Sequence, residues 1–174
     1  MQKLFKKREG EEFTMRIIRT LLRWVLGLTF IWPFFDKLIG LGYTTKADKA
    51  WIAGGSPTAG FLKGSTGPFA PFFQSIGGAG IIDWLFMLTL LFVGIALILG
   101  IGLKIASISG AVLMFLMWAA VLPKTQSFLL LDDHVIYLLL LILIGFAFTK
   151  YEDWASLSNW WKNTKLVKKV PFFQ

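Results

Sequence analysis

The first long apolar segment of the chain, RIIRTLLRWVLGLTFIWPFFDKLIGL, carries charged residues at both of its ends. Three arginines share one helical face near its start, and an acid–base pair stands near its end: Arg16, Arg19 and Arg23, then Asp36 and Lys37. A helix rises about 1.5 Å per residue, so Arg23 and Asp36 lie only about 20 Å apart, whereas a bilayer's hydrocarbon core is about 30 Å thick. The segment therefore predicts a membrane helix with one charged end at membrane depth. We expect the arginines to snorkel to the cytoplasmic surface, which leaves Asp36 and Lys37 near the far surface as candidate site residues.

The composition indicates an integral membrane protein. Of the 174 residues, 56% are hydrophobic and the mean hydropathy is +0.66, more apolar surface than a soluble domain of this length can bury. There is no cysteine and only one histidine. These counts exclude disulfides, cysteine-ligated iron–sulfur clusters and thiolate zinc sites, so we expect no haem, no iron–sulfur cluster and no metal.

The apolar segments predict an all-α fold, an integral membrane four-helix bundle. The spans are expected at about residues 17–39, 83–103, 105–122 and 134–149. Gly100 and Gly102 mark a short turn between the second and third spans, which makes these two helices antiparallel neighbours. Ala106 and Gly110 form a small-xxx-small pair that permits close helix packing.

The chain divides into three parts around this bundle. Residues 1–14 are predicted to be a cytosolic N-terminal tail, residues 15–149 the transmembrane domain, and residues 150–174 a basic amphipathic tail. A basic region before an apolar run also resembles a signal peptide. However, no small-x-small cleavage site follows the run, so we expect an uncleaved first membrane helix.

The connection over residues 40–80 is rich in Gly, Pro and aromatic residues. It is too interrupted for a spanning helix and too apolar for a free linker, so we expect short helical pieces at the membrane interface. Ser56 followed by Pro57 is typical of a helix start. Two interpretations stay open for this outer loop, a lid over the bundle and a passive interfacial connection.

The C-terminal tail predicts an amphipathic helix on the anionic cytoplasmic leaflet. Trp154, Leu157 and Trp161 recur at helical spacing. Lysines supply the opposite, basic side: Lys162, Lys165, Lys168 and Lys169. Such a helix adheres to a lipid bilayer or docks a partner protein.

The distribution of lysine and arginine predicts the orientation. With both termini inside, 13 of the 18 Lys and Arg residues lie on the inner side, and the outer side keeps Lys37, Lys46, Lys49, Lys63 and Lys124. This asymmetry follows the positive-inside rule and favours a multi-pass protein of a prokaryotic plasma membrane with both termini cytoplasmic. The same placement explains the net charge of +8 without nucleic acid, because the basic residues flank apolar spans.

Under this topology three helices bring ionisable residues to the outer side. We take four of them as candidate catalytic residues: His134, Asp133, Asp36 and Lys37. Three others are candidates for binding a quinone or another polar ligand: Asp83, Tyr137 and Trp51. Histidine titrates near neutral pH and could exchange protons with a carboxylate or a quinone oxygen.

A structural interpretation competes for each of these residues. Carboxylates at helix starts cap free amides, which is the expectation for Asp132 and an equal alternative for Asp83. Asp36 and Lys37 could simply mark the membrane surface. Trp51 is more typical of a belt or packing residue than of a ligand-stacking group.

The chain resembles the DoxX family of small membrane proteins, and its DoxD-like branch in particular, over about residues 16–147. The resemblance rests on RTLLRWVLGLTFIWPFFDKL, on WIAGGSPTAGFLKG and GPFAPFF in the loop, and on two later stretches, IDWLFMLTLLFVGIALILGIGLKIA and DDHVIYLLLL. It implies a four-helix membrane subunit. In some members it also implies thiosulfate oxidation coupled to quinone reduction, usually beside a second subunit.

Three functions follow as hypotheses. The first is a membrane subunit of a quinone-linked oxidoreductase acting on thiosulfate or a related sulfur anion, working with a second oxidoreductase subunit or a soluble redox protein. The second is a non-enzymatic scaffold for soluble redox partners. The third is a small-molecule or proton carrier that uses the outer polar residues.

Overall fold

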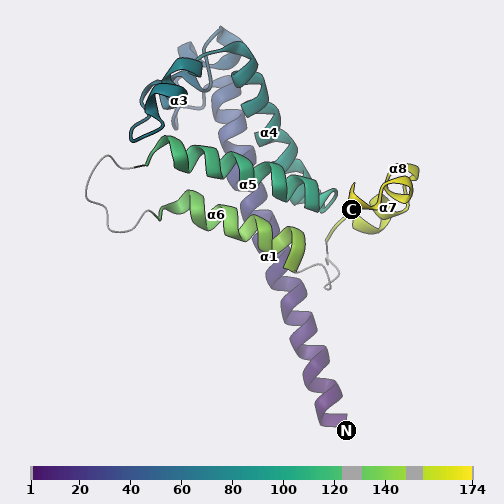
Figure 1. Ribbon diagram of the computed structural model, residues 1–174. Coiled ribbons are helices and arrows are strands. Elements are labelled where there is room, and N and C mark those ends of the chain that lie inside the picture. The colour runs from purple at the N-terminus through teal and green to yellow at the C-terminus, as the bar shows by residue number, and fades with distance from the viewer. Residues whose placement is uncertain (1, 123–130, 148–154, 174) are drawn as a thin grey trace.

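The computed structural model describes residues 2–122, 131–147 and 155–173, and Figure 1 shows their arrangement. These residues are helical or irregular, with no strand among them. Three helices are long and apolar enough to cross a membrane: Glu9–Ile39, Gly80–Leu99 and Leu103–Ala120. A shorter apolar helix covers Asp133–Ala147. The expected all-helical membrane architecture is therefore confirmed in its coarse form.

The first helix, α1, runs over Gln2–Ile39 and continues through Pro33. Its 38 residues correspond to roughly 57 Å, so its N-terminal part extends well beyond the other helices (Figure 1). The polar stretch predicted as a tail is thus helical from Gln2 onward. The first predicted span forms the C-terminal part of this helix.

Antiparallel to α1 lies α4, Gly80–Leu99, and the two helices approach closely (Figure 1). Glycines permit this contact. A Cβ on Gly94 would lie 2.4 Å from Ile31 Cγ1, and one on Gly27 would lie 2.7 Å from Ile98 Cγ1. Neither position has room for a larger side chain.

Helices α5, Leu103–Ala120, and α6, Asp133–Ile142, lie side by side, and in the view of Figure 1 they run across α1 and α4. The turn before α5 uses left-handed backbone at Gly100 (φ 71°) and Gly102 (φ 56°), as expected for glycine. Both glycines of the turn and the fully buried Ala106 serve packing and turning, as predicted.

A π-helical segment, η3, Leu143–Ala147, continues α6. Its Gly145 packs against Ser107, where a Cβ would lie 2.5 Å from the Ser107 Oγ. The predicted loop after Pro123, up to residue 130, and the last two residues of the fourth predicted span lie outside the described residues.

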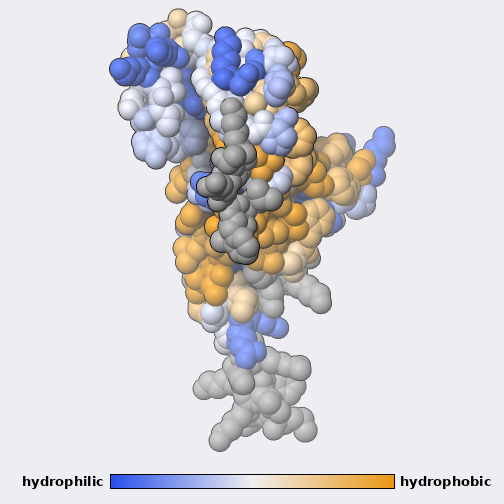
Figure 2. All heavy atoms as spheres, turned by 60° about the vertical axis from the view of Figure 1, so that its left-hand side comes forward, coloured by the Kyte–Doolittle hydropathy of each residue, from blue (hydrophilic) through white to orange (hydrophobic). Residues whose placement is uncertain are grey.

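The main core lies between α1, α4, α5 and α6. Large apolar side chains fill it: Leu26, Phe30, Phe34, Met87, Leu90, Val93, Leu97, Leu103, Met114, Leu141 and Ile144. Opposite this core, the helices expose apolar stripes at the spacing of one helical face. On α1 the stripe comprises Ile18, Leu21, Val25, Leu28, Trp32, Phe35 and Ile39. Figure 2 shows the result, an apolar belt between more polar ends, which is the surface of a protein in lipid.

The outer loop contains four short helices, as predicted: η1, Ala47–Lys49, η2, Trp51–Ala53, α2, Ala59–Lys63, and α3, Ala70–Ile76. Leu62 and Phe73 are buried in a second core against the end of α5. The Thr66 N–H donates to the Ala120 carbonyl at 3.0 Å. The loop therefore packs on the bundle along its length and is no free connection.

The C-terminal segment differs from the expected single amphipathic helix. It forms α7, Ser158–Lys162, α8, Lys165–Lys169, and a 3-10 turn, η5, Pro171–Phe173. The break arises because Thr164 takes extended backbone and caps α8 by accepting a hydrogen bond from the Val167 N–H. Trp154, the first residue of the predicted apolar face, lies outside the described residues.

The prediction that the arginines snorkel is wrong for Arg19 and Arg23. Both side chains are buried, and Arg23 is wholly covered. Its guanidinium donates a hydrogen bond to the Ala155 carbonyl, and Gly100 packs against it. The arginines lie on the side of α1 opposite its lipid-facing stripe, so they point into the protein.

Candidate functional site

Asp36, on the last turn of α1, holds the start of the outer loop. Its buried carboxylate accepts hydrogen bonds from the Tyr43 N–H and the Thr44 N–H, both at 3.0 Å, and from the Thr44 hydroxyl at 2.6 Å. Gly40 makes this return possible with φ 70°, because a Cβ there would lie 2.5 Å from Ala47 Cα. Because it accepts three hydrogen bonds from the loop, this carboxylate has a structural role.

Lys37 is half-buried beside Asp36 but does not share its contacts. Within the described part of the chain, the Lys37 ammonium has neither a hydrogen bond nor an ion pair. Asp36 and Lys37 interact as neighbouring opposite charges, but of the two only Asp36 is hydrogen-bonded to the loop among the described residues. The Lys37 ammonium can donate to another group, whereas the Asp36 carboxylate accepts hydrogen bonds from the loop.

Asp83, in the first turn of α4, is a second clamp on the same loop. Its buried carboxylate accepts from the Ser56 hydroxyl at 2.9 Å, the Thr58 N–H at 3.0 Å and the Thr58 hydroxyl at 2.5 Å. The Ser56 Oγ in turn accepts from the Ala59 N–H at 3.1 Å, across the turn that precedes α2. The expectation that Asp83 caps its own helix is not met, since its acceptors go to a segment 25 residues earlier.

Trp51 packs edge-on against Trp84, with ring centroids 4.6 Å apart and an interplanar angle of 72°. It also lies against the main core. The structure therefore shows Trp51, a candidate ligand-binding residue, in a packing contact. Edge-to-face aromatic pairs of this kind stabilise a fold by about 1 kcal/mol.

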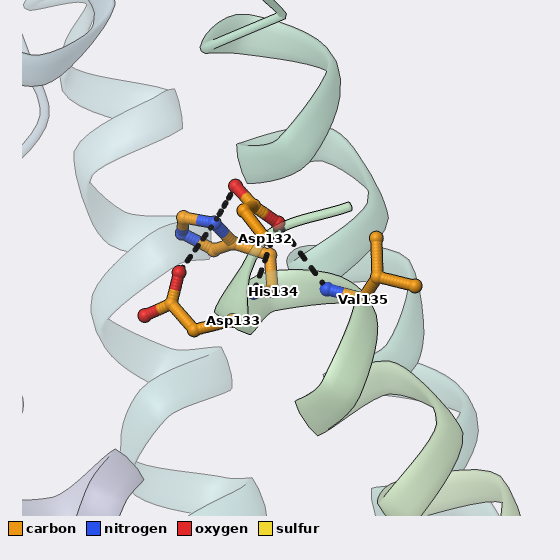
Figure 3. Close-up of polar contacts among 4 residues, drawn as sticks. All are labelled: Asp132, Asp133, His134 and Val135. Carbon is orange, nitrogen blue, oxygen red and sulfur yellow. Dashed lines mark hydrogen bonds and ion pairs between the residues drawn. The ribbon is translucent and has the colours of Figure 1, made fainter. Parts of the chain in front are cut away.

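The start of α6 brings together three ionisable side chains from adjacent positions (Figure 3). Asp132 is the N-cap, as predicted: its Oδ1 accepts from the His134 N–H at 3.1 Å and from the Val135 N–H at 3.4 Å. Its Oδ2 lies 2.8 Å from the His134 Nδ1. Asp133 is more distant, with its Oδ1 3.5 Å from the same nitrogen. We call Asp132 and His134 the dyad.

The dyad has a defined protonation geometry. The Asp132 carboxylate, 2.8 Å from Nδ1, can accept a hydrogen bond from that nitrogen, and Nε2 has no hydrogen bond to any described residue. The His134 side chain is 16% exposed, whereas that of Asp133 is 67% exposed. An oriented, partly covered imidazole is suited to exchange a proton with a ligand.

The same three residues could also hold a cation. Asp132, Asp133 and His134 each offer a ligand atom, and these atoms lie within 4.8 Å of one another. In the structure, however, the Asp132 oxygens already serve the helix cap and the His134 Nδ1. A cation there would have to compete with these two contacts.

Tyr137 lies one turn after His134 and is partly buried against the main core. Its hydroxyl has no hydrogen bond to any described residue. It flanks the dyad on the same helix.

The outer candidates do not form one network among the described residues. Hydrogen bonds link Asp36 to residues 43–44, Asp83 to residues 56–58, and Asp132 to the start of α6. None joins one of these groups to another. Two of the carboxylates, Asp36 and Asp83, thus hold the outer loop, whereas Asp132 orients His134.

Sequence reasoning missed the inward role of Arg23. The signal was present, because Leu26 and Phe30 continue the arginine face of α1 at helical spacing, and that face is buried. Arg23 shared a face with core residues and not with the lipid-facing stripe.

Comparison with protein family models, with curated proteins and with solved structures found no match to this chain.

Proposed function

We propose that this chain is a four-span protein of a prokaryotic plasma membrane with both termini cytoplasmic. The fourth span is the apolar segment Asp133–Ala147, whose 15 residues extend roughly 22 Å beside α5. A π-helical end and the N-terminal cap on Asp132 satisfy backbone groups that lipid would leave unpaired. An even number of crossings agrees with the inner-side excess of lysine and arginine.

Within this bundle, His134 exchanges protons with a lipid-dissolved quinone, and the protein acts as the membrane subunit of a quinone-linked oxidoreductase. The observation that carries this proposal is the 2.8 Å contact between His134 Nδ1 and Asp132 Oδ2, which orients the ring so that Nε2 can take up a proton and pass it to a quinone oxygen. Reduction of a quinone consumes two electrons and two protons, so a positioned proton donor and acceptor is the group the reaction needs.

The surroundings of the dyad support an apolar ligand. Leu131 and Ile136 are exposed next to it, so a hydrophobic molecule in the outer leaflet reaches His134 along an apolar surface. The half-buried Lys37 supplies a cationic group at the outer end of α1 for a sulfur anion such as thiosulfate. With no cysteine in the chain, electrons pass directly from donor to quinone or through a cofactor of a second subunit.

Purified protein in lipid nanodiscs, with and without proteins that co-purify with it, tests the proposal. Thiosulfate is added together with a soluble quinone analogue, and quinone absorbance is followed. We expect reduction that His134→Ala abolishes and that Asp133→Asn leaves near the wild-type rate. Absence of any turnover in both preparations, with the protein folded, contradicts the proposed redox function.

A further inference from the structure

Residues 155–173 fold into a small unit, here called the C-terminal cap, at the end of the bundle where α4 meets α5 (Figure 1). Two hydrogen bonds fix it there. The Leu157 N–H donates to the Leu99 carbonyl at 2.8 Å, and the Arg23 guanidinium donates to the Ala155 carbonyl. Its last turn, η5, packs against α5. The cap is therefore held at a fixed height relative to the spans.

The cap has an interior of its own. Val167 is buried, and the Trp161 Nε1–H donates to the Phe173 carbonyl at 2.6 Å, which closes the segment on itself. Thr164 caps α8. Because these contacts fix which side chains point inward, the outward surface is defined as well.

That outward surface combines positive charge with large apolar side chains. Its lysines are all exposed: Lys162, Lys165, Lys168 and Lys169. Between them stand exposed apolar residues: Leu157, Trp160, Leu166, Val170 and Phe172. Trp160 is 62% exposed, an unusual state for a tryptophan in water. No acidic residue occurs between positions 155 and 173, so nothing within the cap neutralises the lysines.

We infer that the cap binds the anionic phospholipid headgroups of the membrane that the bundle spans. Lysines attract acidic headgroups, and tryptophan and phenylalanine insert at the boundary between headgroups and acyl chains. The cap is tied to the end of α4, whose outward residues Ile95 and Leu99 belong to the lipid-facing surface. The inference is independent of the redox chemistry proposed above.

The test uses a single thiol, since the chain has no cysteine of its own. Asn159→Cys places it on the exposed side of α7, where an attached environment-sensitive fluorophore reports contact with lipid. The labelled full-length protein is reconstituted in phosphatidylcholine, or in the same lipid with about 30 mol% phosphatidylglycerol. We expect quenching by acrylamide to be about threefold weaker in the anionic bilayer and to recover in about 1 M salt.

Two matched triple variants give the inference its control. Replacing Lys165, Lys168 and Lys169 with glutamine is expected to remove the difference between the bilayers. Replacing the exposed loop residues Lys46, Lys49 and Lys63 with glutamine is expected to preserve it. Equal quenching in both bilayers overturns the inference. Protection that arises only on adding a soluble protein fraction, in either bilayer, overturns it as well and assigns the surface to a protein partner.

Discussion

The carboxylates at the ends of α1 and α4 that face residues 40–80 differ from the carboxylate before α6 in the groups that they bind. Asp36 and Asp83 each accept three hydrogen bonds from the outer loop and are buried. Asp132 accepts from its own helix and orients a histidine whose Nε2 has no hydrogen bond to any described residue. A buried carboxylate surrounded by donors stabilises a fold, whereas a carboxylate that positions an imidazole prepares it for proton transfer. Aspartates at similar positions near helix ends thus have different roles.

The largest expected effect is on turnover, from His134→Ala. If His134 exchanges protons with the quinone, its removal lowers the rate by about 10²–10⁴-fold, the usual contribution of a general acid–base. Thermal unfolding should change little, because His134 is a capping partner only through its backbone. Turnover within twofold of wild type would exclude His134 from the mechanism. Asp132 would then have a structural role like that of Asp36 and Asp83.

Asp83→Ala should mainly affect stability. It leaves two hydroxyls and one buried N–H near residues 56–58 without their acceptor, at a cost of about 3 kcal/mol. We expect a lower thermal midpoint and faster proteolysis within the outer loop, measured on protein in nanodiscs. The matched control is Asp48→Ala, an exposed aspartate of the same loop that makes no such contact and should unfold like wild type.

Asp36→Ala should act in the same direction but less strongly, by about 2 kcal/mol, because its loop partners, residues 43–44, are more exposed and regain hydrogen bonds from water. Limited proteolysis should show cleavage near Tyr43 before the rest of the loop opens. If Asp36→Ala instead left loop cleavage unchanged and lowered quinone turnover, Asp36 would belong with the dyad.

Asp132→Asn should have the smallest effect of the four substitutions, and it should change both stability and turnover. Asparagine also caps helices well, so the unfolding free energy should fall by less than about 1 kcal/mol. Its amide no longer holds the same ring tautomer, and turnover should fall by about 10-fold. Loss of stability without any loss of turnover would make Asp132 a cap alone.

Much of the fold was predictable because hydropathy is read over long stretches. The second and third spans were predicted within a few residues of Gly80–Leu99 and Leu103–Ala120. The cap role of Asp132 was also predictable, since its partners lie two and three residues away. Local geometry and apolar periodicity are properties of the sequence itself.

The clamps were not predictable from the same information. The Asp36 carboxylate meets Thr44 only because Gly40 turns the chain back, and Asp83 meets Thr58 across 25 residues of loop. The inward path of Arg23 depends on a C-terminal segment 132 residues away. Such contacts follow from tertiary packing, so the residue types indicated polar sites but not their partners.

The most direct test of the account is the protonation state of His134, which is the only histidine in the chain. With ¹⁵N-labelled histidine, solid-state NMR on the protein in lipid gives one pair of ring-nitrogen signals. We predict a proton on Nδ1, facing Asp132, and a shift of the Nε2 signal when a quinone is added. An Nδ1 without a proton in the resting protein, or signals unchanged by quinone, would contradict the assignment of the dyad as the proton-exchanging site.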